Sequence, residues 1–367
     1  MNRIAPPPRP ERLLSAILGL MISLSGACFA DAVSPVVGFL RFDCPGGSDT
    51  VVSTPFHPAP RWVGRLSSDP SDQGSGTFRL NIEGAPEFAP GELTDAPHFV
   101  FCRNGSSPSG RHFLVTAHSA ATVDIAASAA DLSGLNASGL VSVIPAWTLG
   151  TLLPADTQTA LHPSTGNLAT QRGSELLLFD RVTDGVNLAP ARRFFVTASG
   201  WLEAGSYAPA DDQVIEPGHP FVIRHRAGAD ATSFVAVQQV YGDDVTLPIR
   251  GRQAGPQDTV LGLPRPIPVK LSDLDLDAVF ETSASTDPGD RKDELRVFAN
   301  AQTGQNKAPE ATYFKVLGQW IKDTTGFPVA DNDVIDPAAG VLIRKAATTS
   351  DGSVWWVNVP RYDVAAP

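Results

Sequence analysis

The chain has few cysteines, few basic residues and, beyond its first thirty residues, no long apolar run. Three cysteines in 367 residues are too few for the disulfide-dense scaffolds of small secreted domains. The 28 Lys and Arg residues against 39 Asp and Glu residues give a net charge of -11. This charge argues against a nucleic-acid partner, because phosphate binding draws on basic side chains. Without a later apolar stretch of about 20 residues, we expect no transmembrane segment after signal cleavage.

The first thirty residues have the pattern of an export signal. Three arginines precede a short apolar core at 13–24, and the small residues of GACFA favour cleavage after Ala30. The pattern predicts a signal peptide over 1–30 and a chain exported to the periplasm, the outer surface or the extracellular space. Lipid attachment at Cys28 is the alternative, ranked second because Ser25 stands where such attachment usually requires Leu. Removal of three arginines and one glutamate with this segment changes the net charge from -11 to -13.

Two cysteines then remain, Cys44 and Cys102. An even pair in an oxidising compartment favours one disulfide. That bond would clamp an inserted segment to its host module. The alternative is a pair of buried free thiols.

The chain repeats itself. DDQVIEPGHPFVIRH at 211–225 is close to DNDVIDPAAGVLIRK at 331–345, and an offset of 119 residues aligns ELLLFD at 175–180 with ELRVFA at 294–299. The same offset places Trp201 on Trp320. Proline, aromatic and aliphatic positions agree in order over about fifty residues, which predicts a tandem duplication.

The repeat extends upstream with a different spacing. SDTVVSTPF at 48–56 matches QDTVLGLPR at 257–265, 209 residues later, so the first copy carries about 90 additional residues. We therefore expect three parts after the signal: a first β module over 31–230, an inserted β unit at about 67–146 within it, and a second β module over 231–367.

The fold class follows from short strand-like runs and frequent turns. Runs such as TVVSTPF and RRFFVTAS are rich in Val, Phe and Thr and are bounded by Gly, Pro, Asp and Asn, which is typical of strands and hairpins. The 32 prolines exceed the usual share of about 5% and argue against long helices. We predict an all-β protein of two tandem related β-sandwich or open-barrel modules, the first interrupted by a small β-barrel or hairpin insert.

The order of these pieces resembles a family of exported bacterial all-β proteins. The resemblance is carried by VGF at 37–39, GSDT at 47–50, WTLG at 147–150 and two rounds of a module of the form ELLxFD…W…ADDxVxxPGxGFxIRK. It implies export and a modular all-β architecture, and it implies no activity.

Catalytic motifs are not apparent. The chain has no GxSxG nucleophile motif, and its spacing does not indicate a Ser/His/Asp arrangement. A glycosidase-type hydrolase needs two acids about 5–10 Å apart, whereas most acids here fall in turns. We expect no enzyme, and a secreted hydrolase ranks third among the functions considered.

Two histidines form a weak candidate metal site. His112 and His118 lie six residues apart in RHFLVTAH, so on a regular strand they would point to one face and could bind a metal together. A third ligand is not close in sequence, which favours ordinary surface histidines and no cofactor.

Two acidic stretches are weak candidates for calcium. Asp273, Asp275 and Asp277 alternate with Leu, and alternate carboxylates on a strand could supply some of the six to eight oxygens that calcium takes. A solvated edge strand protected by charge is the preferred interpretation. Asp331 and Asp333 precede a hairpin, where we expect their side chains to bond turn backbone.

Six tryptophans raise the possibility of glycan binding, since flat rings stack on sugars. We assign Trp201 and Trp320 to the module cores. For the adjacent pair Trp355 and Trp356 we expect one ring facing inward and one outward. The weak ligand-binding candidates are Trp62, Trp147, Trp355 and Trp356.

These observations favour an exported, non-enzymatic β-module protein with a structural or attachment role at the cell envelope or outside the cell. Its partner would be a protein or a glycan at the cell surface. A carbohydrate-binding or surface-glycan-binding module is the alternative, and exposed tryptophans beside a groove would favour it.

Overall fold

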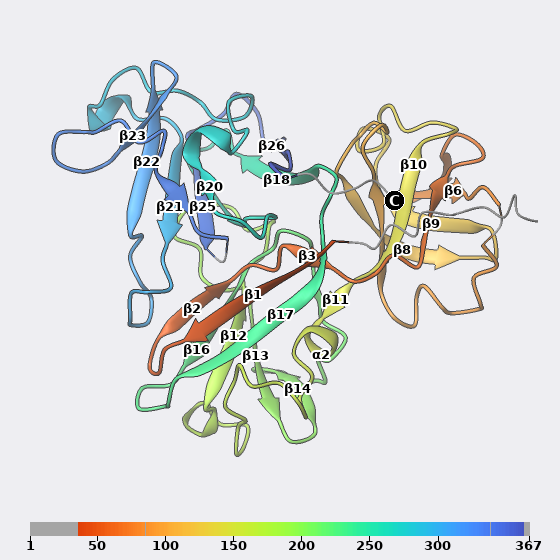
Figure 1. Cartoon of the computed structure of the whole chain (residues 1–367), viewed down its shortest axis with the longest axis horizontal. Helices are drawn as coiled ribbons and strands as arrows, with labels where there is room; N and C mark the ends of the chain where they lie inside the picture. Colours follow the sequence, from red (N-terminus) through yellow and green to blue (C-terminus); the bar gives the residue numbers. More distant parts are fainter. Residues whose placement is uncertain (1–35, 85, 338, 363–367) are drawn as a thin grey trace, which may run out of the picture. The chain divides into compact units, whose positions relative to one another are not determined.

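The structure is a computed structural model that describes residues 36–84, 86–337 and 339–362. These residues form antiparallel sheets with only short helical turns (Figure 1). The predicted all-β class is confirmed. None of the sheets in the described ranges is closed, so the modules are layered sandwiches. The expected signal peptide over 1–30 and its alternative lipid site at Cys28 lie outside the described residues.

The first module pairs a five-stranded sheet of order β14-β13-β12-β16-β2 with a three-stranded ribbon of order β1-β17-β3 and the short pair β11-β15. Their inward side chains, among them Phe42, Trp201 and Ile223, form one core. The bounds are β1 Val37–Cys44, β2 Asp49–Val52, β3 Phe56–His57, β11 Trp147–Thr148, β12 Ser174–Leu178, β13 Arg192–Thr197, β14 Gly200–Glu203, β15 Val214–Ile215, β16 Phe221–His225 and β17 Thr232–Val240, with α2 at Leu149–Leu152 and a 3-10 turn at Ala169–Gln171.

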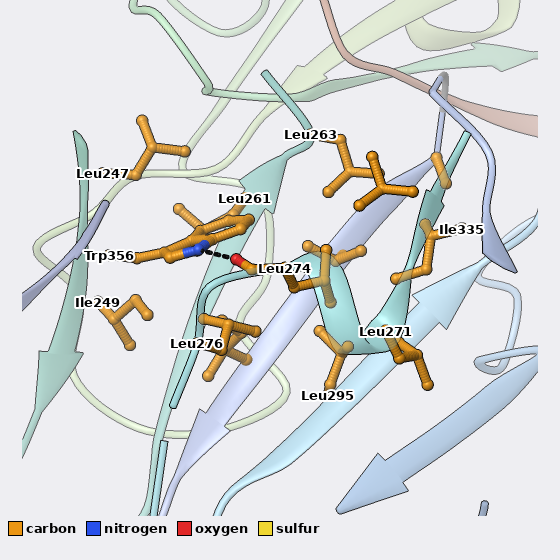
Figure 2. Packing of buried hydrophobic residues seen from close by; sticks show 14 of the residues in the cluster. Leu247, Ile249, Leu261, Leu263, Leu271, Leu274, Leu276, Leu295, Ile335 and Trp356 are labelled. Atoms are coloured by element: carbon orange, nitrogen blue, oxygen red, sulfur yellow. Dashed lines mark hydrogen bonds between the residues drawn. The ribbon is translucent and has the colours of Figure 1, made fainter. Parts of the chain in front are cut away.

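The second module pairs a five-stranded sheet of order β19-β25-β21-β22-β23 with the ribbon β18-β26 and the short pair β20-β24. Its core surrounds Trp356, whose indole N–H donates to the Leu274 carbonyl (Figure 2). The bounds are β18 Val245–Gly251, β19 Gln257–Gly262, β20 Val269–Lys270, β21 Glu294–Phe298, β22 Ala311–Val316, β23 Gln319–Lys322, β24 Val334–Ile335, β25 Gly340–Lys345 and β26 Gly352–Asn358, with 3-10 turns at Leu271–Asp273 and Pro288–Asp290.

Strands of the two modules that match in sequence occupy the same positions in their sheets. Details of hydrogen bonding match as well. The N–H of Trp201 donates to the Asp211 carboxylate at 3.3 Å, and the N–H of Trp320 donates to the Asp331 carboxylate at 2.8 Å. The two tryptophans are 0% and 2% exposed, as expected for core residues.

The insert is a seven-stranded sheet of order β4-β10-β7-β8-β9-β6-β5 with a core of its own. An isolated bridge joins Leu66 to Ile82 beyond β4 and β6 and the sheet is otherwise open, so of the two expected forms, a small barrel or a hairpin, the insert is nearer to a barrel that does not fully close. The bounds are β4 Trp62–Arg65, β5 Ser71–Gly74, β6 Thr77–Asn81, β7 His98–Cys102, β8 His112–His118, β9 Thr122–Ala126 and β10 Leu140–Pro145.

Strand pairing moves the boundaries between these parts. β17 pairs along its length with β1, so the first module continues to Val240 and not only to residue 230. β4 pairs with β10 of the insert, so the insert begins at Trp62 and not at residue 67.

The expected disulfide is absent. Cys44 and Cys102 are both free and buried, and they lie in two different cores, that of the first module and that of the insert. Burial raises the pKa of both thiols, that of Cys102 to about 12. The alternative of two buried thiols is the one the structure shows.

Within the described ranges, no helix is both long and apolar enough to cross a bilayer.

Candidate functional site

A cleft of about 550 Å³ is lined by residues of both five-stranded sheets, and we call it the central cleft. Such a volume falls in the usual range of small-ligand sites, about 300–1,000 Å³. Its apolar lining comes from strands β2, β12, β16, β19 and β25 and from the residues at the ends of β12 and β21. These side chains are Val51, Leu177, Phe179, Val222, Val260, Phe298 and Leu342.

Strand alternation explains why apolar side chains reach this cleft. Leu176 and Leu178 of β12 point into the first module's core, so Leu177 between them points to the opposite face. In β25, Val341 and Ile343 face the second core while Leu342 lines the cleft. The run of three leucines therefore serves two surfaces, the core and the cleft.

Each module contains an arginine–aspartate ion pair whose arginine also donates a hydrogen bond to an asparagine of the other module. Arg224 donates to both carboxylate oxygens of Asp49 at 2.7 Å, and it also donates to the Asn306 side chain at 2.7 Å. The hydrogen bonds to Asp49 raise the pKa of the Arg224 guanidinium. Both modules contribute to this site, because Asp49 and Arg224 belong to the first and Asn306 to the second.

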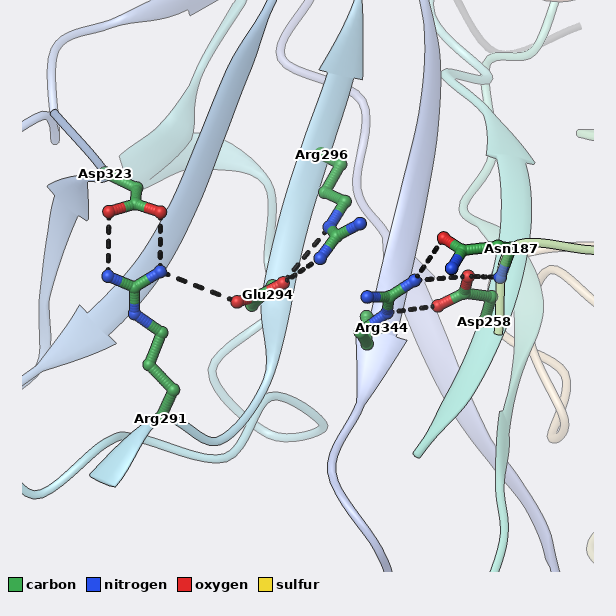
Figure 3. A network of polar contacts seen from close by, with 7 residues as sticks. All are labelled: Asn187, Asp258, Arg291, Glu294, Arg296, Asp323 and Arg344. Carbon is green, nitrogen blue, oxygen red and sulfur yellow. Dashed lines mark hydrogen bonds and ion pairs between the residues drawn. The ribbon is translucent and has the colours of Figure 1, made fainter. Parts of the chain in front are cut away.

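The second module has the reciprocal arrangement (Figure 3). Arg344 donates to Asp258 at 2.7 and 2.8 Å and to the side chain of Asn187, which belongs to the first module, at 3.0 Å. The hydrogen bonds to Asp258 raise the pKa of the Arg344 guanidinium. The two modules thus have equivalent bidentate pairs, each completed by a loop from the opposite module, and Asp49 and Arg224 of the first pair line the cleft.

Those two loops have the same backbone. Asn187 and Asn306 have φ values of 54° and 52°, in the left-handed region that Asn tolerates better than most residues. Their N–H groups donate to Asp258 and Asp49, each at 2.7 Å. The residues two positions earlier, Gly185 and Gly304, accept the N–H of the same aspartates at 2.9 Å. Each loop therefore attaches to the other module through backbone and side chain.

The charge of the lining differs between the two sides. Where the first module has Leu177 and Leu188, positions 119 residues later in the second module hold Arg296 and Lys307. Arg296 donates to Glu294 at 2.6 Å, and Glu294 also lies 3.6 Å from Arg291 (Figure 3). One carboxylate is therefore shared by two guanidinium groups.

Lys307 has no carboxylate within ion-pair distance among the described residues. Its ammonium donates to the carbonyls of Ala299 and Gln302, at 3.1 and 2.8 Å. Burial lowers the pKa of Lys307, because a desolvated ammonium is disfavoured. Both modules therefore contribute apolar side chains to the cleft, and the second module adds the cationic side chains of Arg296 and Lys307.

A second, smaller pocket of about 220 Å³ is lined by residues of the insert and of both modules, and we call it the junction pocket. The Arg111 guanidinium lies 3.7 Å from the centre of the half-buried Trp355 ring. Arg181 pairs with Glu216 at 3.0 Å, while its Nε has no partner in the described ranges. A pocket with two guanidinium groups and an aromatic ring suits an anionic or hydroxyl-rich ligand.

The candidate histidines do not form a metal site. A bulge in the pairing of β8 between Val115 and Ala117 breaks the strand's alternation, so the expectation of one shared face is wrong. His112 packs against Phe99, and His118 accepts the N–H of Leu93 in the insert core. Burial lowers the pKa of His112 to about 3. Over the ranges that the structure describes, no three His, Cys, Asp or Glu side chains converge as metal ligands.

The acidic stretch at 271–277 is not an edge strand. Leu271–Asp273 is a 3-10 turn and Asp275 has a φ of 58°, so the three carboxylates diverge. Asp275 accepts from Arg361, and Asp277 pairs with Lys315. Asp273 accepts from the neighbouring Ser272 hydroxyl at 3.3 Å. The charged-edge interpretation is therefore wrong, and the alternation reflects leucines buried on a turn.

Asp331 and Asp333 already have protein partners. Asp331 accepts from the Trp320 N–H, and Asp333 accepts from the Tyr313 hydroxyl at 3.0 Å and from Lys322 at 3.2 Å. Asp331 thus bonds the backbone of a strand eleven residues earlier and Asp333 bonds side chains, so the expected bonds to the backbone of their own turn are wrong.

The four candidate tryptophans separate into different environments. Trp356 is 1% exposed and belongs to the second core, while its neighbour Trp355 faces the junction pocket, as the alternation predicts. Trp62 packs on the insert core, and Trp147 donates its indole N–H to the Phe56 carbonyl at 3.1 Å. Only Trp355 of these four lines one of the two sites described above.

A serine–histidine pair that the sequence did not reveal lies in the first module. The His225 ring bonds the Ser174 hydroxyl at 2.7 Å and the Thr232 hydroxyl at 2.8 Å. Thr232 itself donates to the Ala160 carbonyl at 2.7 Å. Ser174 and His225 are 1% and 0% exposed. A substrate could not reach this pair without unfolding, so we assign it to the structure of the core.

The cleft residues were missed because no single stretch marks them. The signal was nevertheless present in the repeat: Asn187 and Asn306 fall on each other at the offset of 119, and Arg296 and Lys307 are departures from that repeat. A comparison of the two copies for differences, in addition to agreements, would have selected both cations.

Comparisons with protein-family models, with curated proteins and with solved structures gave no match for this chain.

Proposed function

We propose that this chain is an exported, non-enzymatic binding protein with an attachment role at the cell envelope or outside the cell, and that its binding site is the central cleft. The observation that carries the proposal is the 550 Å³ volume with its apolar lining from both modules. A concave volume of this size with a mainly apolar lining is typical of small-ligand binding sites.

The proposal includes a duplicated architecture and export. The common strand order, the matching Trp N–H contacts and the reciprocal asparagine loops support two copies of one module. The basic and apolar pattern of residues 1–30, and the resemblance to exported all-β proteins, support export. N-terminal sequencing of secreted protein tests this: we expect a mature chain that begins at Asp31, whereas one that retains Met1 would contradict export.

Binding in the cleft can be tested with a neutral hydrophobic fluorophore, 6-propionyl-2-dimethylaminonaphthalene. We expect one probe to bind per chain with a blue-shifted emission. Ala308→Trp should abolish this binding, because Ala308 is an exposed residue of the cleft rim where a large ring would fill the opening without disturbing a core.

The matched control is Ala347→Trp, at an exposed position outside the cleft lining. It should bind the probe as the parent protein does. Absence of any stoichiometric binding, or equal loss in both variants, would contradict the assignment of the cleft.

Glycan binding is a second candidate, favoured by the junction pocket. Trp355 offers a half-buried ring beside Arg111 and Arg181, an arrangement suited to an acidic sugar. Affinity electrophoresis in a gel containing an acidic polysaccharide such as polygalacturonate tests it. Retardation that disappears with Trp355→Ala would support this function, and unchanged mobility of the parent protein would oppose it.

A further inference from the structure

The two walls of the central cleft offer different chemistry to a ligand. On the first module's side, Leu177 and Val222 are 2% and 9% exposed and belong to a small apolar cluster separate from the module's core. On the second module's side, Arg296 and Lys307 replace the leucines found at the matching positions. A neutral apolar ligand would form no ion pair with Arg296 or Lys307.

The other charged groups of the lining are already satisfied. Asp49 and Arg224 bond each other through two contacts at 2.7 Å. Lys307 is the cation without a carboxylate partner among the described residues, and Arg296 shares its carboxylate with another arginine. The lining residues themselves include three cations and one carboxylate, in a chain whose net charge is -11. This local excess of positive charge is complementary to one anionic group.

The lining also favours an alkyl chain over a peptide. A peptide brings an N–H and a C=O group at each residue, and buried groups of this kind need partners. The asparagine side-chain oxygens of the lining already accept from Arg224 and Arg344, and the outer edge of β2 is covered because Asn300 bonds the backbone of Val51 at 2.8 and 2.7 Å. An alkyl chain needs no such partners.

We propose that the central cleft binds a single-chain amphiphile, with its alkyl chain along the partly exposed apolar side chains of Phe179, Val260 and Leu342 and its anionic head group at Lys307 and Arg296. This rests on the proposed binding function of the cleft. The shared chemistry is a carboxylate or phosphate on an alkyl chain, which a free fatty acid or a membrane lipid would each supply.

The test is calorimetric titration of the full mature chain with decanoate and with 1-decanol, which differ in the charged head group. We expect decanoate to bind at least tenfold more tightly. Lys307→Leu and Arg296→Leu should each weaken decanoate about tenfold and leave 1-decanol within twofold. Both variants carry the residue of the other module at the matching position, so the fold should accept them, and an unchanged melting temperature verifies this.

Two controls separate charge from packing. Lys270→Leu removes an exposed lysine outside the cleft and should change neither ligand. Leu342→Ala shortens an apolar lining residue and should weaken both ligands alike. Equal binding of decanoate and 1-decanol, insensitive to Lys307→Leu, would overturn the amphiphile while leaving the cleft as a binding site. Binding of the neutral fluorophore with no binding of either ten-carbon ligand would overturn it as well.

Cosedimentation with phosphatidylglycerol vesicles distinguishes the two sources of the ligand. Cosedimentation that Lys307→Leu abolishes would identify a membrane lipid as the source. Charge-dependent decanoate binding without cosedimentation would identify a free fatty acid. Absence of both would overturn the proposal.

Discussion

At the scale of single residues, the imidazole of His225 is a fully buried titratable group of the first module. It is 0% exposed and lies between two hydroxyls, those of Ser174 and Thr232. Burial, with a smaller contribution from the nearby His162, lowers the pKa of His225 to about 4. Because the ring is neutral in the fold and protonates more readily when unfolded, acid should favour the unfolded chain.

The consequence is a defined pH dependence of stability. Between pH 6.5 and pH 4 the unfolded state binds more protons at this site than the folded state does, so the free energy of unfolding falls as the pH falls. From pH 6.5 to pH 5, His225 alone should lower the free energy of unfolding by about 1.6 kcal/mol. Urea unfolding at the two pH values measures this, and His225→Gln should reduce the difference by that amount. An identical pH dependence in the variant would contradict the assignment.

The two core tryptophans allow a second prediction at this scale. Trp201 and Trp320 are 0% and 2% exposed, and removal of such a ring leaves a large cavity. Trp201→Ala and Trp320→Ala should each lower the free energy of unfolding by about 3–5 kcal/mol, measured by urea denaturation. The double variant should be additive within about 0.5 kcal/mol, because the sites share no partner.

Trp355→Ala is the control for that pair. Its ring is half-buried and stacks on Arg111, so its loss should cost only about 1 kcal/mol. Two core variants no more costly than this control would show that the rings are not core elements.

At the scale of elements, the loops that carry Asn187 and Asn306 connect the two modules. Each asparagine has a positive φ and accepts from an arginine of the other module, at 3.0 and 2.7 Å. Replacement by Ala should cost about 1–2 kcal/mol for the backbone conformation and about 1 kcal/mol for the lost hydrogen bond. Replacement by Gly should cost only the second of these.

We therefore expect Asn→Ala to destabilise more than Asn→Gly at both positions, as measured by urea denaturation. The two positions should give the same ranking, since their contacts are reciprocal. A larger cost for Gly than for Ala at either position would show that the positive φ is not the source of the loss.

The elements also show what the sequence can and cannot reveal. Periodicity identified the strands around ELLLFD and the opposite orientations of Trp355 and Trp356, because alternation is a local property. The turn at Pro217 and Gly218 is also local, and Gly218 has a φ of 62°. The alternation of Asp and Leu at 271–277 predicted an edge strand. This prediction was wrong, because a 3-10 turn can also bury leucines that alternate with aspartates. The partners of its aspartates, such as Lys315 and Arg361, lie far along the chain.

The contacts around the cleft and the positions of the two cysteines also depend on tertiary structure and cannot be predicted from local sequence. The repeat marks Asn187 and Asn306 as equivalent, but it does not show that each bonds the opposite module. Cys44 and Cys102 can be counted from the sequence, yet their positions in two separate cores follow from the packing of whole sheets.

At the scale of the molecule, the insert interrupts the first module in sequence but packs on the second. Phe101 and Ile144 of the insert belong to the same apolar cluster as Trp356. Arg103 pairs with Asp243 at 2.9 Å, and the Phe101 and Tyr241 rings lie 5.7 Å apart. The stability of the insert should therefore be coupled to that of the second module.

The two buried thiols can measure this coupling in a Cys28→Ser background. Both thiols are 0% exposed and have raised pKa values, so alkylation by iodoacetamide requires local opening. Trp356→Ala should speed labelling of Cys102 about 100-fold, which corresponds to about 3 kcal/mol, and change Cys44 far less. Trp201→Ala should have the opposite selectivity, because Trp201 and Cys44 share one core. Mass spectrometry of the two cysteine peptides gives both rates in one sample. Equal acceleration of both thiols by either variant would mean that the described chain opens as one unit, and the coupling inferred from the packing of Phe101 and Ile144 would be wrong.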